Sequence, residues 1–322
     1  MKTLARISTG ALLFMTLPLR PALADETAAA VPAAAYSVGA AFDDDRGVLV
    51  VFGGFRPGLG PVGETWEWNG AWRRVAVSGP SPRNSPALAY DPVRRRVVLF
   101  GGDSRSAAFS DTWEWDGITW TPMNGAGPPG RSLHRMVFVP RRGRVMLFGG
   151  TSSGSGMPDP WEWDGQAWSP IDDSGPIRVL HGLAVDPASG MPVVFGGSSP
   201  PMPSGPGVTS DETWVLGPAG WRSSGPRGPS TRDHVAMVAD PGRKRIVLYG
   251  GASNDSTFSD TWERVGAAWK RMDTAESPGP RANPVMVYDS RLGRVLLYGG
   301  FDARGPRNDL WSWDGVRWKP EP

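Results

Sequence analysis

Short apolar runs that end in two glycines recur along the chain at a period close to 50 residues. The six runs are VVFGG (50–54), VLFGG (98–102), MLFGG (146–150), VVFGG (193–197), VLYGG (247–251) and LLYGG (296–300). Their β-branched and aromatic residues show no polar alternation, which predicts strands buried on both faces. The two glycines give the backbone the freedom to turn and to approach a neighbouring segment. The pattern therefore predicts a tandem repeat of one structural unit.

Each unit is predicted to hold four short strands. An apolar segment and a tight turn precede the run, and a tryptophan-rich segment follows it, as in DTWEWDGITW (111–120). Strand alternation places Trp113 and Trp115 on one face and Glu114 on the other. Asp116-Gly117 is a strong hairpin signal, so a fourth strand begins near Trp120. Six units of four antiparallel strands predict an all-β fold, a six-bladed β-propeller over residues 35–322 as a single domain.

The diglycine and the spaced tryptophans resemble the kelch-repeat family over roughly residues 33–320. The T-W-E-W-D-G form is similar to secreted bacterial kelch-repeat proteins. The resemblance implies that the first strand of each unit is innermost and lines a central channel. If YSVGAAFD (36–43) is the first strand of blade one, every blade is contiguous in sequence. Ring closure would then depend on side-chain packing between blades one and six.

The tryptophans recur in every unit, which favours an architectural role. Large flat side chains fill the space that widens between twisted sheets, and each indole N–H can reach a polar partner. Sugar stacking is the functional alternative, but all 16 tryptophans belong to the repeated motifs.

Residues 1–24 are predicted to be a signal peptide, so the mature protein is expected to be secreted or periplasmic. Lys2 and Arg6 precede a short apolar stretch, and Ala22-Leu23-Ala24 fits a cleavage site. The stretch is too short for a membrane-spanning helix, so an uncleaved anchor is the weaker alternative. Residues 25–34 are expected to form a flexible N-terminal segment.

Removing the leader changes the formal charge from +2 to −1. A nearly neutral chain has no general field for nucleic acid or anionic membranes, and no other apolar run is long enough to span a bilayer. We expect a monomer that binds a protein or glycan ligand, without nucleic acid, cofactor or metal. The chain has no cysteine, so stability in an oxidising compartment must come from packing.

Five of the six units place an arginine 18 residues before the first glycine: Arg83, Arg131, Arg178, Arg232 and Arg281, with Ala35 in unit one. The resemblance implies that these positions surround one mouth of the channel, where eukaryotic kelch adaptors use arginines to capture acidic peptides. Guanidinium groups bind carboxylate, phosphate or sulfate through two parallel hydrogen bonds. The neighbouring polar candidates for ligand binding are Asn84, His134, His181, Asp233, His234 and Asn283. The structural alternative is that each arginine pairs with an aspartate or a carbonyl of the next blade.

The sequence favours a non-catalytic binding module for an anionic ligand, an acidic peptide or a glycan. The cysteine–tyrosine cofactor of galactose oxidase is excluded because cysteine is missing, and the Glu-x-x-x-Asp iron motif of plant specifier proteins is missing too. Bacterial sialic acid mutarotases are the enzyme alternative, with an acid–base pair drawn from Asp233 and the three histidines. A structural envelope protein is a third possibility. The long loop at 198–210 is a further candidate for a functional role, and a flexible loop without a function is the alternative.

Overall fold

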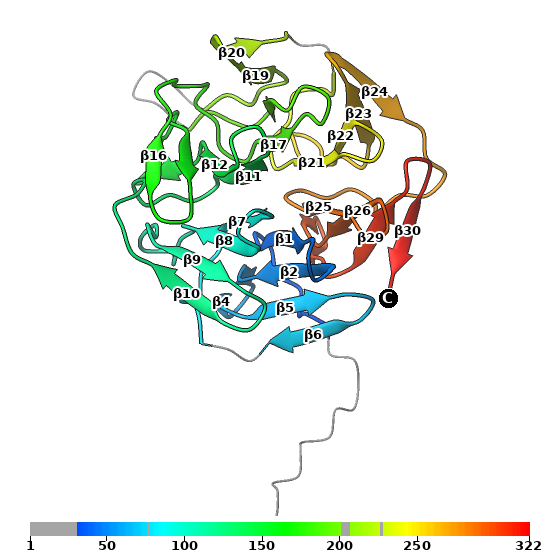
Figure 1. Cartoon of the computed structure of the whole chain (residues 1–322). Helices are drawn as coiled ribbons and strands as arrows, with labels where there is room; N and C mark the ends of the chain where they lie inside the picture. The colour runs from blue at the N-terminus through cyan, green and yellow to red at the C-terminus, as the bar shows by residue number, and fades with distance from the viewer. Residues whose placement is uncertain (1–30, 76–77, 201–206, 226–227) are drawn as a thin grey trace, which may run out of the picture.

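The structure is a computed structural model that describes residues 31–75, 78–200, 207–225 and 228–322. The predicted signal peptide and most of the segment 25–34 lie outside these residues. The described residues form six antiparallel sheets of four strands each and contain no helix. The sheets are arranged like blades around a common centre (Figure 1). The predicted all-β propeller with six blades is therefore confirmed. The described part of the chain contains no helix long and apolar enough to cross a membrane.

The inner half of each blade consists of two strands. The innermost strands are β1 (Gly39–Asp43), β7 (Ala87–Asp91), β11 (Arg135–Val139), β17 (Gly182–Val185), β21 (Ala236–Asp240) and β25 (Val285–Asp289). The second strands carry the apolar runs: β2 (Val48–Phe52), β8 (Arg96–Phe100), β12 (Arg144–Phe148), β18 (Pro192–Phe195), β22 (Arg245–Tyr249) and β26 (Arg294–Tyr298). Nearly every residue of the second strands is buried, as their uninterrupted apolar pattern predicts.

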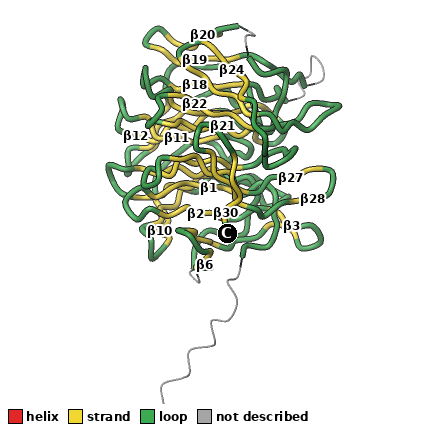
Figure 2. The backbone as a smooth tube through the Cα atoms, turned by 90° about the vertical axis from the view of Figure 1, so that its right-hand side faces the viewer, coloured by secondary structure: helices red, strands yellow, loops and turns green. Residues whose placement is uncertain are grey.

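The outer half carries the tryptophans. The third strands are β5 (Thr65–Trp68), β9 (Thr112–Trp115), β15 (Trp161–Trp163), β19 (Thr213–Gly217), β23 (Thr261–Val265) and β29 (Leu310–Trp313). The outermost are β6 (Trp72–Val75), β10 (Trp120–Met123), β16 (Trp168–Pro170), β20 (Gly220–Ser223), β24 (Ala268–Met272) and β30 (Trp318–Glu321). Small hairpins follow three diglycines: β3 (Phe55–Arg56) with β4 (Gly60–Pro61), β13 (Thr151–Ser152) with β14 (Ser155–Gly156), and β27 (Phe301–Asp302) with β28 (Gly305–Pro306). Figure 2 shows β3, β27 and β28 on the same side of the molecule.

The ring closes by side-chain packing between blades one and six. Blade one is contiguous, because β1 pairs with β2 and no strand from the C-terminus joins that sheet. Trp72 of blade one packs against Tyr298 of blade six with ring centroids 4.9 Å apart. The Nε1 of Trp68 donates a hydrogen bond to the Pro322 carbonyl at 3.3 Å. Closure between the two blades thus follows the arrangement predicted for a contiguous blade one.

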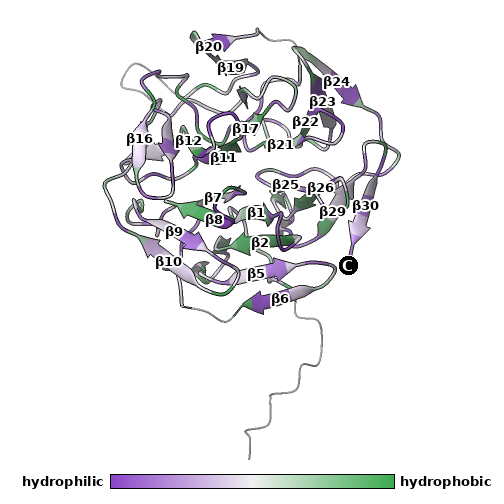
Figure 3. Cartoon of the chain, in the orientation of Figure 1, coloured by the Kyte–Doolittle hydropathy of each residue, from purple (hydrophilic) through white to green (hydrophobic). Residues whose placement is uncertain are grey.

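Hydrophobic residues are frequent on the inner strands, and hydrophilic residues are frequent on the outer strands (Figure 3). Six buried clusters each combine residues from two adjacent blades. The cluster between blades one and two, for example, includes Phe52 and Trp120, whose rings meet edge to face at 5.5 Å. The core is therefore a ring of interfaces between sheets.

The repeated tryptophans form a hydrogen-bonded lattice around the ring. The first tryptophan of each motif donates to an acid of its own blade, as Trp113 does to Asp111 at 2.7 Å. In blades two, three and six the second donates to a glutamate of the preceding blade, as Trp115 does to Glu67 at 3.1 Å. In four blades the third donates to a threonine of the preceding blade, as Trp120 does to Thr65 at 2.9 Å, whereas Trp221 donates to the Asp173 carbonyl. T-W-E-W-x-x-x-x-W is thus complementary to its own next copy, which explains its repetition.

Blade four breaks this lattice. Leu216 occupies the position of the second tryptophan, and Val215 occupies that of the glutamate, as their strand registers show. In blade five, Arg264 takes the tryptophan position opposite Val215 and is buried. The indole-to-glutamate link is therefore missing on both sides of blade four.

The diglycines have the freedom that the sequence predicts. Gly101 and Gly102 adopt φ values of 65° and 92°. A Cβ atom on Gly101 would lie 2.6 Å from the Arg131 carbonyl of the next blade. The Gly102 N–H donates to that carbonyl at 3.0 Å. The two glycines thus allow one blade to hold the start of the next.

Candidate functional site

The five predicted arginines form ion pairs inside their own blades, and all but the partly buried Arg178 are buried. Arg83 has no exposed surface, and its two terminal nitrogens donate to Asp111 at 2.6 and 2.8 Å. Arg83 also donates to the Gly101 carbonyl at 3.1 Å and lies over the Phe109 ring at 4.0 Å. The equivalent pairs are Arg131–Asp159, Arg178–Glu212, Arg232–Asp260 and Arg281–Asp309. We call these five pairs the arginine layer.

Each arginine of the arginine layer pairs with a carboxylate, as the structural alternative predicts, but the position of that carboxylate differs from the prediction. The carboxylate belongs to the same blade and not to the next one. Burial alone raises the pKa of Asp111, but hydrogen bonds from Arg83 and Trp113 overcome this and hold its pKa below the ordinary value. The guanidinium donors are thus largely used inside the blade. The described residues that line the channel cavities do not include these arginines.

The three histidines do not converge. His134 and His181 are buried between blades, where their rings meet Phe100 and Phe148 edge to face at 5.7 and 5.4 Å. Burial, reinforced by Arg131 and Arg135, holds the pKa of His134 well below its ordinary value, so the ring is neutral at pH 7. Burial and nearby arginines act on the pKa of His181 in the same direction.

His234 is partly exposed and forms a dyad with Asp233. The His234 Nδ1 lies 2.6 Å from one carboxylate oxygen of Asp233, and the Ser198 hydroxyl donates to the other at 2.5 Å. Burial opposes ionisation of Asp233, but these two hydrogen bonds dominate and lower its pKa. Ser198 begins the long loop 198–210, of which the structure describes 198–200 and 207–210. The loop therefore touches the dyad.

Six residues in the left-handed conformation surround the same mouth of the channel. They occupy one equivalent position of each blade: Ser37, Ser85, Leu133, Leu180, His234 and Asn283, with φ between 50° and 60°. Neighbouring members are linked through the backbone, as when the Asn283 N–H donates to the His234 carbonyl at 2.7 Å. Since non-glycine residues rarely adopt this conformation, its recurrence in all blades marks a fixed feature of the mouth.

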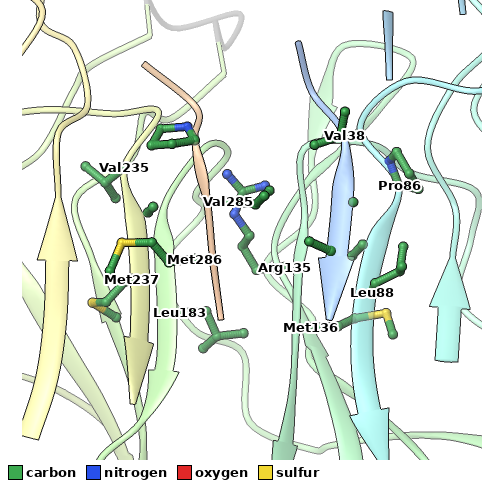
Figure 4. Close-up of a pocket in the computed structure, with 15 residues that line it drawn as sticks. Val38, Pro86, Leu88, Arg135, Met136, Leu183, Val235, Met237, Val285 and Met286 are labelled. Carbon is green, nitrogen blue, oxygen red and sulfur yellow. The ribbon is translucent and has the colours of Figure 1, made fainter. Parts of the chain in front are cut away.

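Arg135 is the charged side chain of the channel interior just below this mouth (Figure 4). Its equivalents in the other blades are Gly39, Ala87, Gly182, Ala236 and Val285. Arg135 belongs to blade three, yet its Nη2 donates to the Asn283 Oδ1 of blade six at 2.9 Å. Blades three and six face each other in a six-membered ring, so this side chain crosses the channel.

Arg135 carries a charge that the described residues do not neutralise. In the described part of the chain, its hydrogen-bond acceptors are the Asn283 amide and, at 3.4 Å, the His134 carbonyl. None of these acceptors is a carboxylate. Burial in the channel lowers the pKa of Arg135 to about 10, so it remains protonated at pH 7. An unpaired cation in a low-dielectric channel attracts an anion.

Two cavities meet at the level of Arg135. The first, of about 100 Å³, holds Arg135 and is lined toward the mouth by Val38, Pro86, Val235 and Pro284. The second, of about 370 Å³, continues along the channel toward Phe138 and Tyr288. Both cavities are lined by Ala40, Leu88, Met136, Leu183, Met237 and Met286. They are therefore successive parts of one channel.

The other polar candidates for ligand binding lie in different surroundings. Asn84 donates to Asp103 at 2.6 Å within blade two. Asn283 makes three hydrogen bonds. Its side chain accepts from Arg135 and donates to the Ser37 hydroxyl at 3.1 Å, and its backbone N–H donates to the His234 carbonyl. The structure thus joins Asn283 to Arg135 through its side chain and to the His234 carbonyl through its backbone, and Arg135 is a residue that the sequence analysis did not single out. A comparison of the six repeats at this position would have shown one arginine among small residues.

Comparison with known proteins supports the fold alone. No model of a known protein family matches this sequence, and no curated protein matches it. A solved structure titled "Structure of YjhT" superposes with a TM-score of 0.69 at 15% identity, covering 91% of this chain and 99% of that chain. The membership of the kelch-repeat family remains a prediction.

Proposed function

We propose that the protein is a secreted or periplasmic binding module whose ligand presents an anionic group to Arg135 in the central channel. The observation that carries this proposal is the cation without a carboxylate partner, enclosed where every other blade has a small residue. Acidic peptides, acidic glycans and smaller organic acids share the carboxylate that such a group binds. The arginine layer supplies a rigid frame for the site.

Calorimetric titration with carboxylates tests this proposal. Replacing Arg135 by Met removes a charge-assisted hydrogen bond, so we expect affinity to fall about 10- to 100-fold. Arg222→Met is the matched control, because it removes one arginine from the exposed outer strand β20. Equal affinity in Arg135→Met and the parent protein would end the proposal.

A sugar mutarotase is the second candidate, and the Asp233–His234 dyad is the observation that favours it. An imidazole oriented by a carboxylate can act as general base and acid. Asn283 links this dyad to Arg135, which would hold a sugar carboxylate. Bacterial sialic acid mutarotases are also the enzyme alternative that the sequence left open.

NMR of freshly dissolved α-sialic acid separates the two candidates. A mutarotase accelerates conversion to the β-anomer, and His234→Gln slows it at least about 100-fold. If the parent protein leaves the spontaneous rate unchanged, the binding module stands and the mutarotase is excluded.

A further inference from the structure

The channel beyond Arg135 is lined mainly by apolar side chains. Phe42, Leu88 and Phe138 line the larger cavity together with the flexible side chains of Met136, Met237 and Met286. Among the described lining residues the one carboxylate is Asp44, and burial raises its pKa. A cavity of about 370 Å³ lies within the usual size range of small-ligand sites.

This surface gives little support to a hydrophilic ligand. The Tyr90 hydroxyl, one of the few polar groups of the lining, donates to Asp45 at 2.8 Å. Sugar hydroxyls buried there would lose hydrogen bonds to water without replacement, which costs free energy. Methionine side chains instead adapt to apolar ligands of varied shape.

The Arg135 guanidinium and the apolar lining of the larger cavity lie one after the other along the channel axis. Arg135 and Asn283 meet at one end, and the next three residues of β11, Met136 to Phe138, line the cavity toward the other mouth. Three residues of strand span about 10 Å. Because an extended chain advances roughly 3.3–3.6 Å for every three bonds, that length accommodates about eight bonds of an alkyl tail.

We infer that the ligand is an amphipathic monocarboxylate of the fatty-acid type, whose carboxylate binds Arg135 and whose tail occupies the apolar channel. This inference rests on the proposed binding function and names its ligand class. The acid enters head first from the mouth near Phe138 and Tyr288, because Arg135 and Asn283 occupy the opposite end. No covalent step is involved.

A chain-length series tests the inference. Butanoate, hexanoate and octanoate are titrated calorimetrically into delipidated protein, below their micellar concentrations. Burial of each methylene is expected to tighten Kd about fourfold, until the tail reaches about eight carbons. A Kd that stays constant along the series would overturn the inference.

Hydrophilic acids distinguish this inference from the proposed function. If glucuronate binds in an Arg135-dependent way while the alkyl series is flat, the binding function stands and the fatty-acid ligand is wrong. If no carboxylate binds, the proposed function itself is wrong. Octanol, which lacks the charge, should bind at least about 10-fold more weakly than octanoate.

Two channel variants provide an independent check. Ala239→Trp fills the larger cavity below Arg135, so octanoate should lose its advantage over butanoate while butanoate still binds. Met286→Glu places a carboxylate in the same channel and should weaken octanoate at least about 10-fold. Ile118→Glu, on an exposed outer turn, is the control for added charge. Unchanged octanoate affinity in both channel variants would contradict the inference, provided that the thermal transition shows folded protein.

Discussion

Arg131 and Arg135 lie four residues apart in blade three, yet their surroundings are opposite. Arg131 is fully buried, donates to Asp159 at 3.1 Å and belongs to an arrangement that five blades share. Arg135 projects into the channel, has no carboxylate partner among the described residues and has no equivalent in another blade. The arginine layer therefore represents architecture, whereas the channel is where the repeats diverge. In a repeat protein, the departure from the repeat is the better guide to function.

The largest expected effect comes from breaking the arginine layer. Asp260→Ala leaves Arg232 buried without its carboxylate, since the two side chains are only 14% and 1% exposed. Removing one partner of a buried ion pair typically costs about 3–5 kcal/mol. Urea denaturation should show a loss of that size. A loss below about 1 kcal/mol would mean that these pairs are not the frame described here.

Acid should destabilise the protein through the two buried histidines. The folded pKa of His134 and His181 is depressed, so their stabilising contribution is complete above the unfolded pKa near 6.5. As pH falls below that value, the unfolded chain binds protons that the folded state does not bind. The free energy of unfolding should then drop by about 2.7 kcal/mol per pH unit for the pair.

Single substitutions assign this pH dependence. His134→Gln and His181→Gln should each remove about half of the slope between pH 6 and 5. Gln166→Leu, on an exposed outer turn, is the control, since it changes no ionisable group. The assignment fails if the slope survives in the double variant of His134 and His181.

A smaller gain is expected from repairing the lattice at blade four. Leu216→Trp places an indole opposite Glu162, which already accepts from Arg142 at 2.7 Å. A cavity of about 240 Å³ beside Leu216 gives room for the larger side chain. The restored hydrogen bond should raise the free energy of unfolding by about 1 kcal/mol. The same change combined with Glu162→Gln should lose most of the gain.

The smallest effect on stability is expected at Arg135. Arg135→Met removes two hydrogen bonds, one of them long, but also relieves an unpaired charge, so the free energy of unfolding should change by less than about 1 kcal/mol. Its stability in urea, compared with Asp260→Ala, measures the contrast between the two regions directly. A loss similar to that of Asp260→Ala would assign Arg135 to the architecture.

The fold could be predicted from the sequence because the same pattern of strands and turns recurs in six repeats. The diglycines, the alternation around Glu114 and the Asp-Gly turns fix the strands and their order. The partner of each arginine was also visible in principle, since Arg83 and Asp111, like three other pairs, are 28 residues apart. For Arg178 and Glu212 the separation is 34, because the loop 198–210 lies between them.

The site was less predictable than the fold, because it depends on the directions of side chains, which residue spacing along the repeat does not determine. His134 and His234 occupy neighbouring positions of the repeat, yet one ring enters an interface between blades and the other lies at the mouth. The contact between Arg135 and Asn283 joins residues 148 positions apart across the channel. Only closure of the ring brings them together.

The most direct test is the titration of a carboxylate followed in the arginine Nε–Hε spectrum of the ¹⁵N-labelled protein, with signals assigned by single arginine variants. We expect the Arg135 signal to shift with octanoate concentration, while those of Arg83, Arg131, Arg232 and Arg281 stay in place. If signals of the arginine layer shift and the Arg135 signal does not, the ligand site is not in the channel and the account is wrong.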